Sequence, residues 1–300
     1  MILAITGATG FVGRHTVERA LSAGHHVRAL TRRPQSDRDG VEWIAGALDD
    51  TGALARLVTG VDAVIHIAGV VNAPDRAGFV AGNIEGTRAV VTAASDANIS
   101  RFVHVSSLAA REPDLSLYGW SKREAERVLA DSPLRATIVR PTGVYGPGDT
   151  EMVDMFRLAR FGLALTPPRG RVSLVAVEDL AALLVTLAGQ DLPPGSLFEV
   201  DDGTALTHAA LARAIGRAMG RPRLLPVPLP AAAVRLGARL DRWWRGRGAK
   251  LTPDRANYLL HPDWVADPAR RPPPFLWSPR IPTDAGLLAT AQWYREQRLL

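Results

Sequence analysis

Short apolar runs alternate with longer amphipathic stretches through the first two thirds of the chain. The first run covers residues 2–5 and is followed by an amphipathic stretch that ends near Gly24. Further apolar runs follow at 26–30, 62–67 and 101–106. Strands that alternate with helices in this way predict a parallel sheet with helices on both of its faces. We therefore expect an α/β fold built on a doubly wound parallel sheet.

The turn after the first apolar run is rich in glycine and has the pattern of a phosphate site. It reads Thr6-Gly7-Ala8-Thr9-Gly10-Phe11-Val12-Gly13. In such a turn the first glycine turns the chain, the second lets the backbone approach a pyrophosphate, and the third allows close packing of helix on strand. The helix N-terminus adds free N–H groups and the positive end of its dipole. The spacing is G-x-x-G-x-x-G rather than G-x-G-x-x-G, but its place directly after a strand predicts a dinucleotide site in a Rossmann-type fold.

The regular alternation loosens near residue 150, and proline becomes common from about residue 192. We expect a dinucleotide-binding core at 1–150, with segments from about 170–200 returning to it. Residues 151–300 then form a smaller, mostly helical C-terminal region that binds the substrate.

Four shorter segments of this C-terminal half carry their own predictions. Strands that extend the sheet are expected near 172–177 and 197–200. The proline-rich run 226–230 predicts a stiff connector. Residues 283–298 predict a last helix.

Two residues four positions apart suggest acid–base chemistry. The chain has only two lysines, and one of them, Lys122, follows Tyr118 by four residues. On a helix these positions share one face. A cation beside a phenol favours the ionised form and lowers its pKa from about 10. A tyrosine with such a neighbour can exchange a proton with a carbonyl compound.

Together with several later segments, these features resemble the extended short-chain dehydrogenase/reductase family, which includes sugar-nucleotide epimerases and hydroxysteroid dehydrogenases. The resemblance covers about residues 1–225. The matching segments are His66-Ile67-Ala68-Gly69, Asn83-Ile84-Glu85-Gly86-Thr87, Val105-Ser106-Ser107, Tyr118-Gly119-Trp120-Ser121-Lys122, Arg140-Pro141-Thr142-Gly143-Val144-Tyr145-Gly146-Pro147-Gly148 and Val177-Glu178-Asp179-Leu180.

The resemblance implies roles for individual residues. Tyr118 would pass a proton to the substrate oxygen, Ser107 would hydrogen-bond that oxygen, and Lys122 would lower the pKa of Tyr118 and bind the nicotinamide ribose. The cofactor-binding residues it implies are Gly7, Thr9, Gly10, Phe11, Val12, Gly13, Thr31, Arg32, Arg33, Ala47, Leu48, Ile67, Ala68, Gly69, Asn83, Val105, Ser106, Tyr118, Lys122, Pro141, Thr142, Gly143 and Val144.

The end of the second strand bears on the choice of cofactor. Thr31 stands where an NAD site usually has an acid for the ribose 2′-hydroxyl, and Arg32 and Arg33 follow it. Guanidinium groups suit bidentate contacts with a 2′-phosphate, so NADP(H) is favoured over NAD(H). The alternative is a pair of solvated arginines. Ala47 replaces an acid that often contacts the adenine in the family, which leaves backbone groups or Asp49 for that role.

Composition excludes several classes of function. The chain has no cysteine, and its seven histidines lack the spacing of metal ligands, so we expect no disulfide, thiol nucleophile or metal site. It shows no basic leader and no apolar run of about 18 residues. We expect a cytoplasmic protein, with peripheral attachment to the inner face of the membrane as a variant of that location.

Residues 230–250 differ from the rest in charge. Residues 235–255 hold seven basic and two acidic residues, a surplus of five in a chain whose net charge is +6. One helical face would carry Ala233, Leu236, Leu240, Trp243 and Trp244, and another Arg235, Arg239 and Arg242. This pattern is typical of an interfacial membrane segment. An ordinary helix packed on the core with a solvated basic face has the same pattern, whereas the chain has no nucleic-acid-binding motif.

The leading hypothesis is an NADPH-dependent carbonyl reductase of a lipid-like ketone, such as a 3-oxo-sphingolipid (ceramide) or a steroid, because the tail resembles hydroxysteroid-dehydrogenase-like and bacterial ceramide reductase members. A sugar-nucleotide epimerase or reductase is the first alternative, with Arg223, Arg235 or Arg239 binding a diphosphate. Dehydration is disfavoured because Leu108-Ala109 follows Ser107 where dehydratases have Asp-Glu. The second alternative is a non-catalytic NADP-binding accessory subunit. Family members often form homodimers, and we expect one here.

Overall fold

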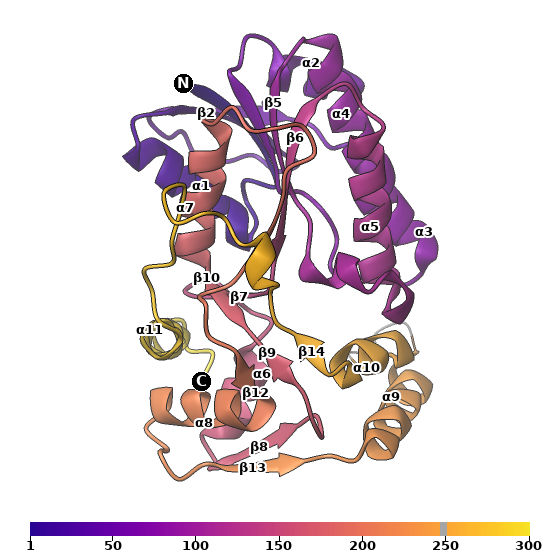
Figure 1. Ribbon diagram of the computed structural model, residues 1–300, viewed down its shortest axis with the longest axis vertical. Coiled ribbons are helices and arrows are strands. Elements are labelled where there is room, and N and C mark those ends of the chain that lie inside the picture. Colours follow the sequence, from indigo (N-terminus) through magenta and orange to yellow (C-terminus); the bar gives the residue numbers. More distant parts are fainter. Residues whose placement is uncertain (247–250) are drawn as a thin grey trace. The chain divides into compact units, whose positions relative to one another are not determined.

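The computed structural model describes residues 1–246 and 251–300, with the side chain of Arg242 excepted (Figure 1). These residues form two units, and each unit is assembled from three separate stretches of chain. The first unit comprises Met1–Pro141, Leu180–Val200 and Ala269–Trp277, and the second Thr142–Asp179, Asp201–Pro268 and Ser278–Leu300.

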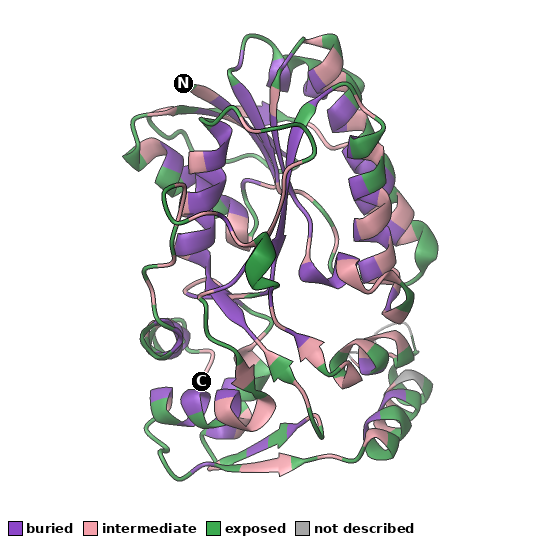
Figure 2. Cartoon of the chain, in the orientation of Figure 1, coloured by how far each residue is buried: buried purple, intermediate pink, exposed green. Residues whose placement is uncertain are grey.

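A seven-stranded sheet forms the centre of the first unit. Its strands lie in the order β11-β6-β5-β4-β1-β2-β3, and every neighbouring pair is parallel. Figure 2 shows that buried residues are concentrated along these strands. The strands are β1 (Ile2–Thr6), β2 (His26–Thr31), β3 (Val41–Ala45), β4 (Ala63–His66), β5 (Arg101–Val105), β6 (Arg135–Pro141) and β11 (Leu197–Val200). The expected doubly wound α/β fold is confirmed.

Helices cover both faces of this sheet (Figure 1). On one face lie α2 (Thr51–Val58), α4 (Gly86–Asp96) and α5 (Leu117–Ala130), and on the other α1 (Phe11–Ser22) and α7 (Val177–Ala188). Apolar side chains of α2, α4 and α5 pack on the sheet in one buried cluster, since sheet and helices each bury their apolar side there. Short elements join α4 and α5 to the sheet: α3 (Arg76–Phe79), the π-helix η1 (Val80–Glu85), and the 3-10 helices η2 (Leu108–Arg111) and η3 (Pro113–Leu115).

The second unit combines helices with short strands. Its helices are α6 (Val153–Ala159), α8 (His208–Ala218), α9 (Ala231–Arg245), α10 (Pro253–Leu260) and α11 (Thr283–Glu296). Its strands are β7 (Gly143–Tyr145), β8 (Leu163–Thr166), β9 (Arg171–Val172), β10 (Leu174–Ala176), β12 (Leu206–Thr207), β13 (Leu225–Pro228) and β14 (Asp263–Trp264). Tyr145, Phe156 and Tyr294 are fully buried in its core. The last helix is confirmed, and no helix in the described ranges is long and apolar enough to cross a membrane.

Two predictions for the C-terminal half need correction. The segment near 172–177 forms β9 and β10, which pair with β12, β14 and β7 rather than with the seven-stranded sheet. The edge beside β6 is taken by β11, the second segment predicted to extend the sheet.

The proline-rich connector is a strand for most of its length, because β13 pairs with β8 in parallel register. The backbone N–H groups of Leu225 and Leu229 donate to β8 and the residue before it. Pro226 and Pro228, which have no N–H to donate, stand at intervening positions.

Candidate active site

The glycine turn between β1 and α1 accepts no larger residue at two positions. Gly7 has φ of +72°, and a Cβ on it would lie 2.7 Å from the backbone nitrogen of Ala68. A Cβ on Gly13 would lie 2.0 Å from the carbonyl oxygen of Gly7. The turn is closed by a hydrogen bond from Gly10 N–H to that same oxygen, at 2.9 Å. The first and third glycines are therefore needed for the positive φ and for close packing of helix on strand.

The N-terminus of α1 is open to a ligand. Gly10 is the N-cap residue and supplies no side-chain cap, so the first N–H groups of the helix are free to bind an anion. A pocket of about 630 Å³ extends from this turn to the end of β2. Its lining contains four arginines and no carboxylate: Ala8, Thr9, Gly10, Arg14, Val17, Thr31, Arg32, Arg33, Gln35, Arg38 and Trp43. Uncapped N–H groups and a basic pocket fit the phosphates of a dinucleotide.

Thr31 shapes the basic end of this pocket. Its hydroxyl donates to the carbonyl oxygen of Arg33 at 2.7 Å and accepts from the N–H of Arg33 at 3.3 Å. These bonds hold the Arg32–Arg33 turn at the end of β2. Ala47 and Leu48 do not line the pocket. The Leu48 side chain instead packs against Gly86, where a Cβ would lie 2.7 Å from Leu48 Cδ1. Ala47 therefore offers the pocket no side-chain contact.

Sequence reasoning missed four polar or aromatic lining residues: Arg14, Gln35, Arg38 and Trp43. Only Arg14 carried a local signal, since it stands one helical turn after Gly10. Its Nε donates to the carbonyl oxygen of Thr9 at 2.9 Å, and Arg38 forms an ion pair with Glu18 at 2.6 Å.

Ser107 and Tyr118 are brought together by the packing of η2 on α5. Ser107 is the N-cap of η2 and accepts a hydrogen bond from the N–H of Ala109 at 3.2 Å. A Cβ on Gly119 would lie 2.6 Å from the carbonyl oxygen of Ala109, so glycine is needed where η2 approaches α5. In this arrangement Ser107 lies close enough to Tyr118 to lower the pKa of its phenol.

Lys122 is buried one turn along α5. Its Nζ donates to the carbonyl oxygen of Val105 at 2.9 Å, so it ties α5 to the end of β5. Burial lowers the pKa of Lys122 to about 8, although the carboxylate of Glu126 acts in the opposite direction. Tyr118 differs from the sequence-based expectation, because burial raises the pKa of its phenol and the nearby Ser107 offsets this only in part. No effect of Lys122 on this pKa is resolved, so the lowering by Lys122 stays a prediction.

Asn83 connects the π-helix η1 to the same site. Its side-chain oxygen accepts from Val70 N–H at 2.7 Å, and its amide nitrogen donates to Ser121 Oγ at 2.8 Å. A Cβ on Gly69 would lie 2.8 Å from Asn83 Oδ1 and 3.2 Å from Lys122 Nζ. Gly69, Asn83 and Lys122 are thus neighbours, and a π-helical segment at such a place is typical of functional sites.

Two histidines stack behind this site in the sheet. His66 on β4 and His104 on β5 are register partners, with ring centroids 5.4 Å apart. His66 makes bonds of 2.7 Å to Thr6 Oγ1 and 3.0 Å to Thr87 Oγ1, and Thr6 Oγ1 accepts from Ala68 N–H at 3.2 Å. Burial, helped by the charge of Lys122, lowers the pKa of His66 to about 3, so the ring is neutral at physiological pH.

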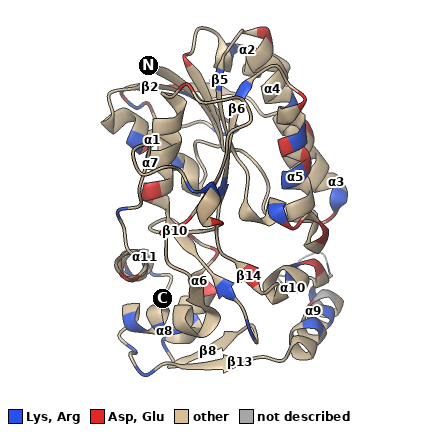
Figure 3. Cartoon of the chain, viewed as in Figure 1, with Lys and Arg blue, Asp and Glu red and all other residues tan. Residues whose placement is uncertain are grey.

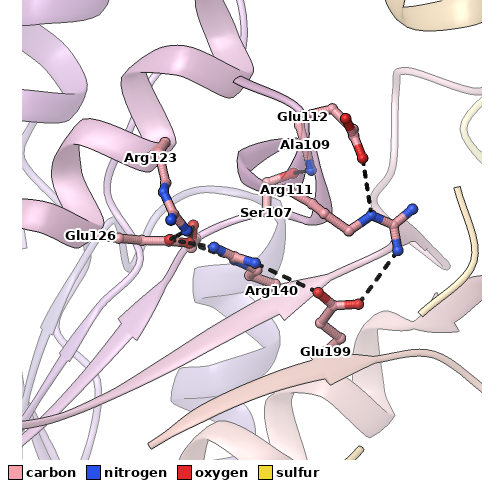
Figure 4. A network of polar contacts seen from close by, with 9 residues as sticks. Ser107, Ala109, Arg111, Glu112, Arg123, Glu126, Arg140 and Glu199 are labelled. Atoms are coloured by element: carbon pink, nitrogen blue, oxygen red, sulfur yellow. Dashed lines mark hydrogen bonds and ion pairs between the residues drawn. The ribbon is translucent and has the colours of Figure 1, made fainter. Parts of the chain in front are cut away.

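A buried network of charges supports the strands that carry the site (Figure 4). Arg140 on β6 donates to both carboxylate oxygens of Glu126 on α5, at 2.8 and 2.6 Å. The same carboxylate accepts a 2.5 Å hydrogen bond from Ser106 Oγ. Glu199 on β11 lies 3.5 Å from Arg140 and 3.6 Å from Arg111 of η2. The network therefore joins α5, η2, β6, β11 and the residue after β5.

The remaining predicted cofactor residues occupy several elements. Phe11 and Val12 form the first turn of α1, Ile67 follows β4, and Pro141 ends β6, all in the first unit. Thr142, Gly143 and Val144 belong to the second unit, where Gly143 and Val144 begin β7.

Comparison with known proteins identifies the class of this site. A family profile described as NAD(P)H-binding matches residues 7–191. The chain is 38% identical over 312 residues to the ceramide reductase of Caulobacter vibrioides, covering 98% of this chain and 94% of that protein. It is 31% identical over 332 residues to the 2-alkyl-3-oxoalkanoate reductase of Stenotrophomonas maltophilia, covering 96% of this chain and 97% of that protein.

Solved structures show the same fold over nearly the whole chain. The crystal structure of gox2253 matches with a TM-score of 0.80 at 24% identity, covering 100% of this chain and 99% of that one. A UDP-N-acetylglucosamine 4-epimerase from Bacillus cereus matches with a TM-score of 0.72 at 20% identity, covering 98% and 96%. From its sequence relatives and its glycine-turn fold, the chain is an NAD(P)-dependent oxidoreductase and belongs to the NAD(P)H-binding extended short-chain dehydrogenase/reductase family.

Proposed function

We propose that this protein uses NADPH to reduce a ketone on a lipid-like molecule, with a 3-oxo-sphingolipid or ceramide as the first candidate and a steroid as the second. The observation that carries the proposal is that Ser107 and Tyr118 are brought together next to buried Lys122. It occurs in a chain that aligns over 98% of its length with a ceramide reductase. The second relative is named for reduction of a 3-oxoalkanoate, which is also a ketone beside an alkyl chain.

The site residues suit proton donation to a ketone. A nicotinamide dinucleotide supplies the hydride when bound. Because burial raises the pKa of Tyr118, the phenol keeps its proton at neutral pH and can donate it to the carbonyl oxygen. Ser107 Oγ accepts from Ala109 N–H, which leaves its own proton to stabilise charge that develops on that oxygen. Below about pH 8, the pKa of Lys122, its ammonium group is protonated and places a positive charge one helical turn from the phenol.

The preference for NADPH rests on the basic end of the pocket. Arg14, Arg32, Arg33 and Arg38 line it, and no carboxylate does. A carboxylate at the end of β2 would bind a ribose 2′-hydroxyl and repel a 2′-phosphate, whereas Thr31 does neither. Guanidinium groups can bind the phosphate in a bidentate manner.

The deciding experiment measures oxidation of NADPH and NADH by the purified protein with detergent-dispersed substrates. The panel contains 3-oxo-sphingoid and 3-oxo-ceramide lipids, keto-steroids and keto-sugar nucleotides. Tyr118→Phe removes the proposed proton donor, and Tyr258→Phe is the matched control, because Tyr258 stacks on Trp264 in the second unit. We expect turnover of a lipid ketone with NADPH that Tyr118→Phe abolishes and Tyr258→Phe retains.

Two results would contradict the proposal. Activity confined to sugar nucleotides would make the protein an epimerase or reductase of that class. Tight binding of NADPH without turnover of any substrate would favour a non-catalytic accessory subunit.

A further inference from the structure

Helix α9 directs its large apolar side chains away from the protein. Val234 and Ala238 are buried and pack with Ala256 of α10. Trp243 and Trp244, in contrast, are 84% and 77% exposed, and Leu236 and Leu240 are exposed with them. The helix therefore packs on α10 through its smaller residues, which lie on neither the large apolar face nor the basic face. Its large apolar side chains do not pack on the core as they would in an ordinary amphipathic helix.

The strand pair β8–β13, which precedes α9 in the same unit, exposes apolar side chains as well. Ala164 faces the buried core, whereas Leu163 and Leu165 are exposed on the opposite side of β8. Leu225, also exposed, is the register partner of Leu163, and Val227 is the partner of Leu165. Neighbouring partners in a parallel pair point to the same face, so the outer face of this pair is apolar throughout.

The two exposed regions are continuous along the chain. β13 ends at Pro228 and leads through Leu229 and Pro230 into α9, along one end of this unit (Figure 1). We call their exposed large apolar side chains the apolar face: Phe161, Leu163, Leu165, Leu225, Leu236, Leu240, Trp243 and Trp244. Exposed apolar groups gathered in this way mark an interaction surface rather than ordinary protein exterior.

The charges around the apolar face are mostly positive, and Asp241, the one acid of α9, is paired with Arg245. Between Asp202 and Asp241 the chain has six arginines and no acidic residue, and residues 155–177 also contain no acid. Arg235 and Arg239 are exposed on α9, and Arg160 and Arg223 are exposed next to the strand pair. Figure 3 shows basic positions along α9. A second copy of the chain placed on this face would bring arginines against arginines, whereas an anionic surface complements them.

We propose that the apolar face docks this protein on the surface of a bilayer that contains anionic phospholipids. Trp243, Trp244 and the leucines enter the boundary between headgroups and acyl chains, where tryptophan is favoured. The arginines at the border pair with lipid phosphates. The proposal concerns a surface in the second unit and does not depend on the substrate or cofactor proposed above.

Flotation of the purified full chain with lipid vesicles tests this docking. One set of vesicles contains phosphatidylcholine alone, and the other contains phosphatidylcholine with about one third phosphatidylglycerol, each at low and high salt. We expect binding to the anionic vesicles that weakens with salt. The double substitution Arg235→Gln with Arg239→Gln should lower that binding about tenfold or more at low salt, because each arginine near an anionic surface contributes appreciably to affinity.

Substitutions of apolar residues separate the parts of the face. Trp243→Gln with Trp244→Gln should weaken binding about tenfold or more. Leu163→Asn with Leu165→Asn should also weaken it, which tests whether the strand pair contributes. The matched control is Phe275→Gln, since Phe275 is 91% exposed and belongs to the first unit. Circular dichroism and thermal unfolding show whether each variant is folded as the wild type is.

Three results would overturn the proposal. The wild type could fail to float with either set of vesicles. Folded tryptophan variants could bind as the wild type and Phe275→Gln do. The tryptophan substitutions could convert a dimer to a monomer in sedimentation, which would make the face an interface between copies. Because the assay contains no ketone and no cofactor, its failure is distinguishable from failure of the proposed reductase activity.

Discussion

Substitution of Glu126 by glutamine tests the charge network that supports the candidate site. Glu126 is the buried carboxylate that binds Arg140 through both oxygens and accepts from Ser106 Oγ. Glu126→Gln keeps the shape of the side chain and removes its charge. The guanidinium of Arg140 is itself buried and would keep only Glu199, at 3.5 Å, as an acidic partner among the described residues.

The expected loss of stability follows from the burial of this ion pair. Removal of one partner from a buried pair destabilises a protein by about 3–5 kcal/mol, because the other charge stays in the interior. The remaining carboxylate of Glu199 favours the lower end, about 3 kcal/mol. For a chain of 300 residues that corresponds to a fall in Tm of roughly 5 °C.

The same substitution should also change the pH dependence of catalysis. The carboxylate of Glu126 raises the pKa of Lys122 against the effect of burial, so its removal lowers that pKa. Two charges about 6 Å apart, as expected for positions one turn apart, interact by at most about 3 kcal/mol at an effective dielectric constant near 20. The pH at which activity falls on the alkaline side should therefore move down by up to about two pH units.

Thermal unfolding and the pH profile of kcat measure the two effects. Glu124→Gln on the same helix is the matched control, because Glu124 pairs with Arg127, whose side chain is 64% exposed. Surface pairs of this kind contribute about 1 kcal/mol or less. If Glu126→Gln and Glu124→Gln have the same Tm and the same pH profile, the network has neither role.

Three further predictions concern the wild type and the cofactor pocket. Reductase activity should fall above about pH 8, because Lys122, with its pKa of about 8, loses its proton while Tyr118, whose pKa is raised, keeps its own; a flat profile of kcat to pH 10 would contradict this. Thr31→Asp should raise the KM for NADPH by about tenfold or more and change that for NADH much less, because a carboxylate there repels a 2′-phosphate; equal effects on both cofactors would refute the assigned pocket. Stability should fall as pH drops below about 6.5, because His66 has a pKa of about 3 when folded and unfolded chains bind the proton first. At pH 4.5 this histidine alone lowers the free energy of unfolding by about 3 kcal/mol. Denaturant unfolding at pH 6.5 and at pH 4.5 measures the difference, which should be smaller in His66→Gln.

Local spacing was sufficient to predict several parts of the structure. The glycine turn follows β1 directly, and Tyr118 and Lys122 both lie on α5, because these patterns depend only on neighbours along the chain. The apolar runs of the first two thirds predicted strands of the main sheet for a similar reason. The sequence could not show that β10 pairs with β7, because pairing depends on which sheet edge is already occupied.

Contacts between distant residues account for what sequence reasoning missed. Arg38 lines the pocket from the segment between β2 and β3 and Trp43 lines it from β3, and no local pattern marks them. Glu126 stands four residues after Lys122, which was a usable signal, but its partner Arg140 comes from another element. Amphipathic periodicity identified the apolar side of α9, yet it could not show that the smaller residues at 234 and 238 pack instead.

The division of the chain between two units has a consequence for its biosynthesis. The chain passes from one unit to the other five times, after Pro141, Asp179, Val200, Pro268 and Trp277. A nascent chain that ends before β11 leaves the edge of β6 unpaired, and unpaired strand edges promote aggregation. The second unit lacks Leu287 and Tyr294 of its core until α11 has left the ribosome. The first unit is complete only once Ala269–Trp277 has been made, and the second unit only once α11 has been made, so loss of α11 should leave the core of the second unit incomplete.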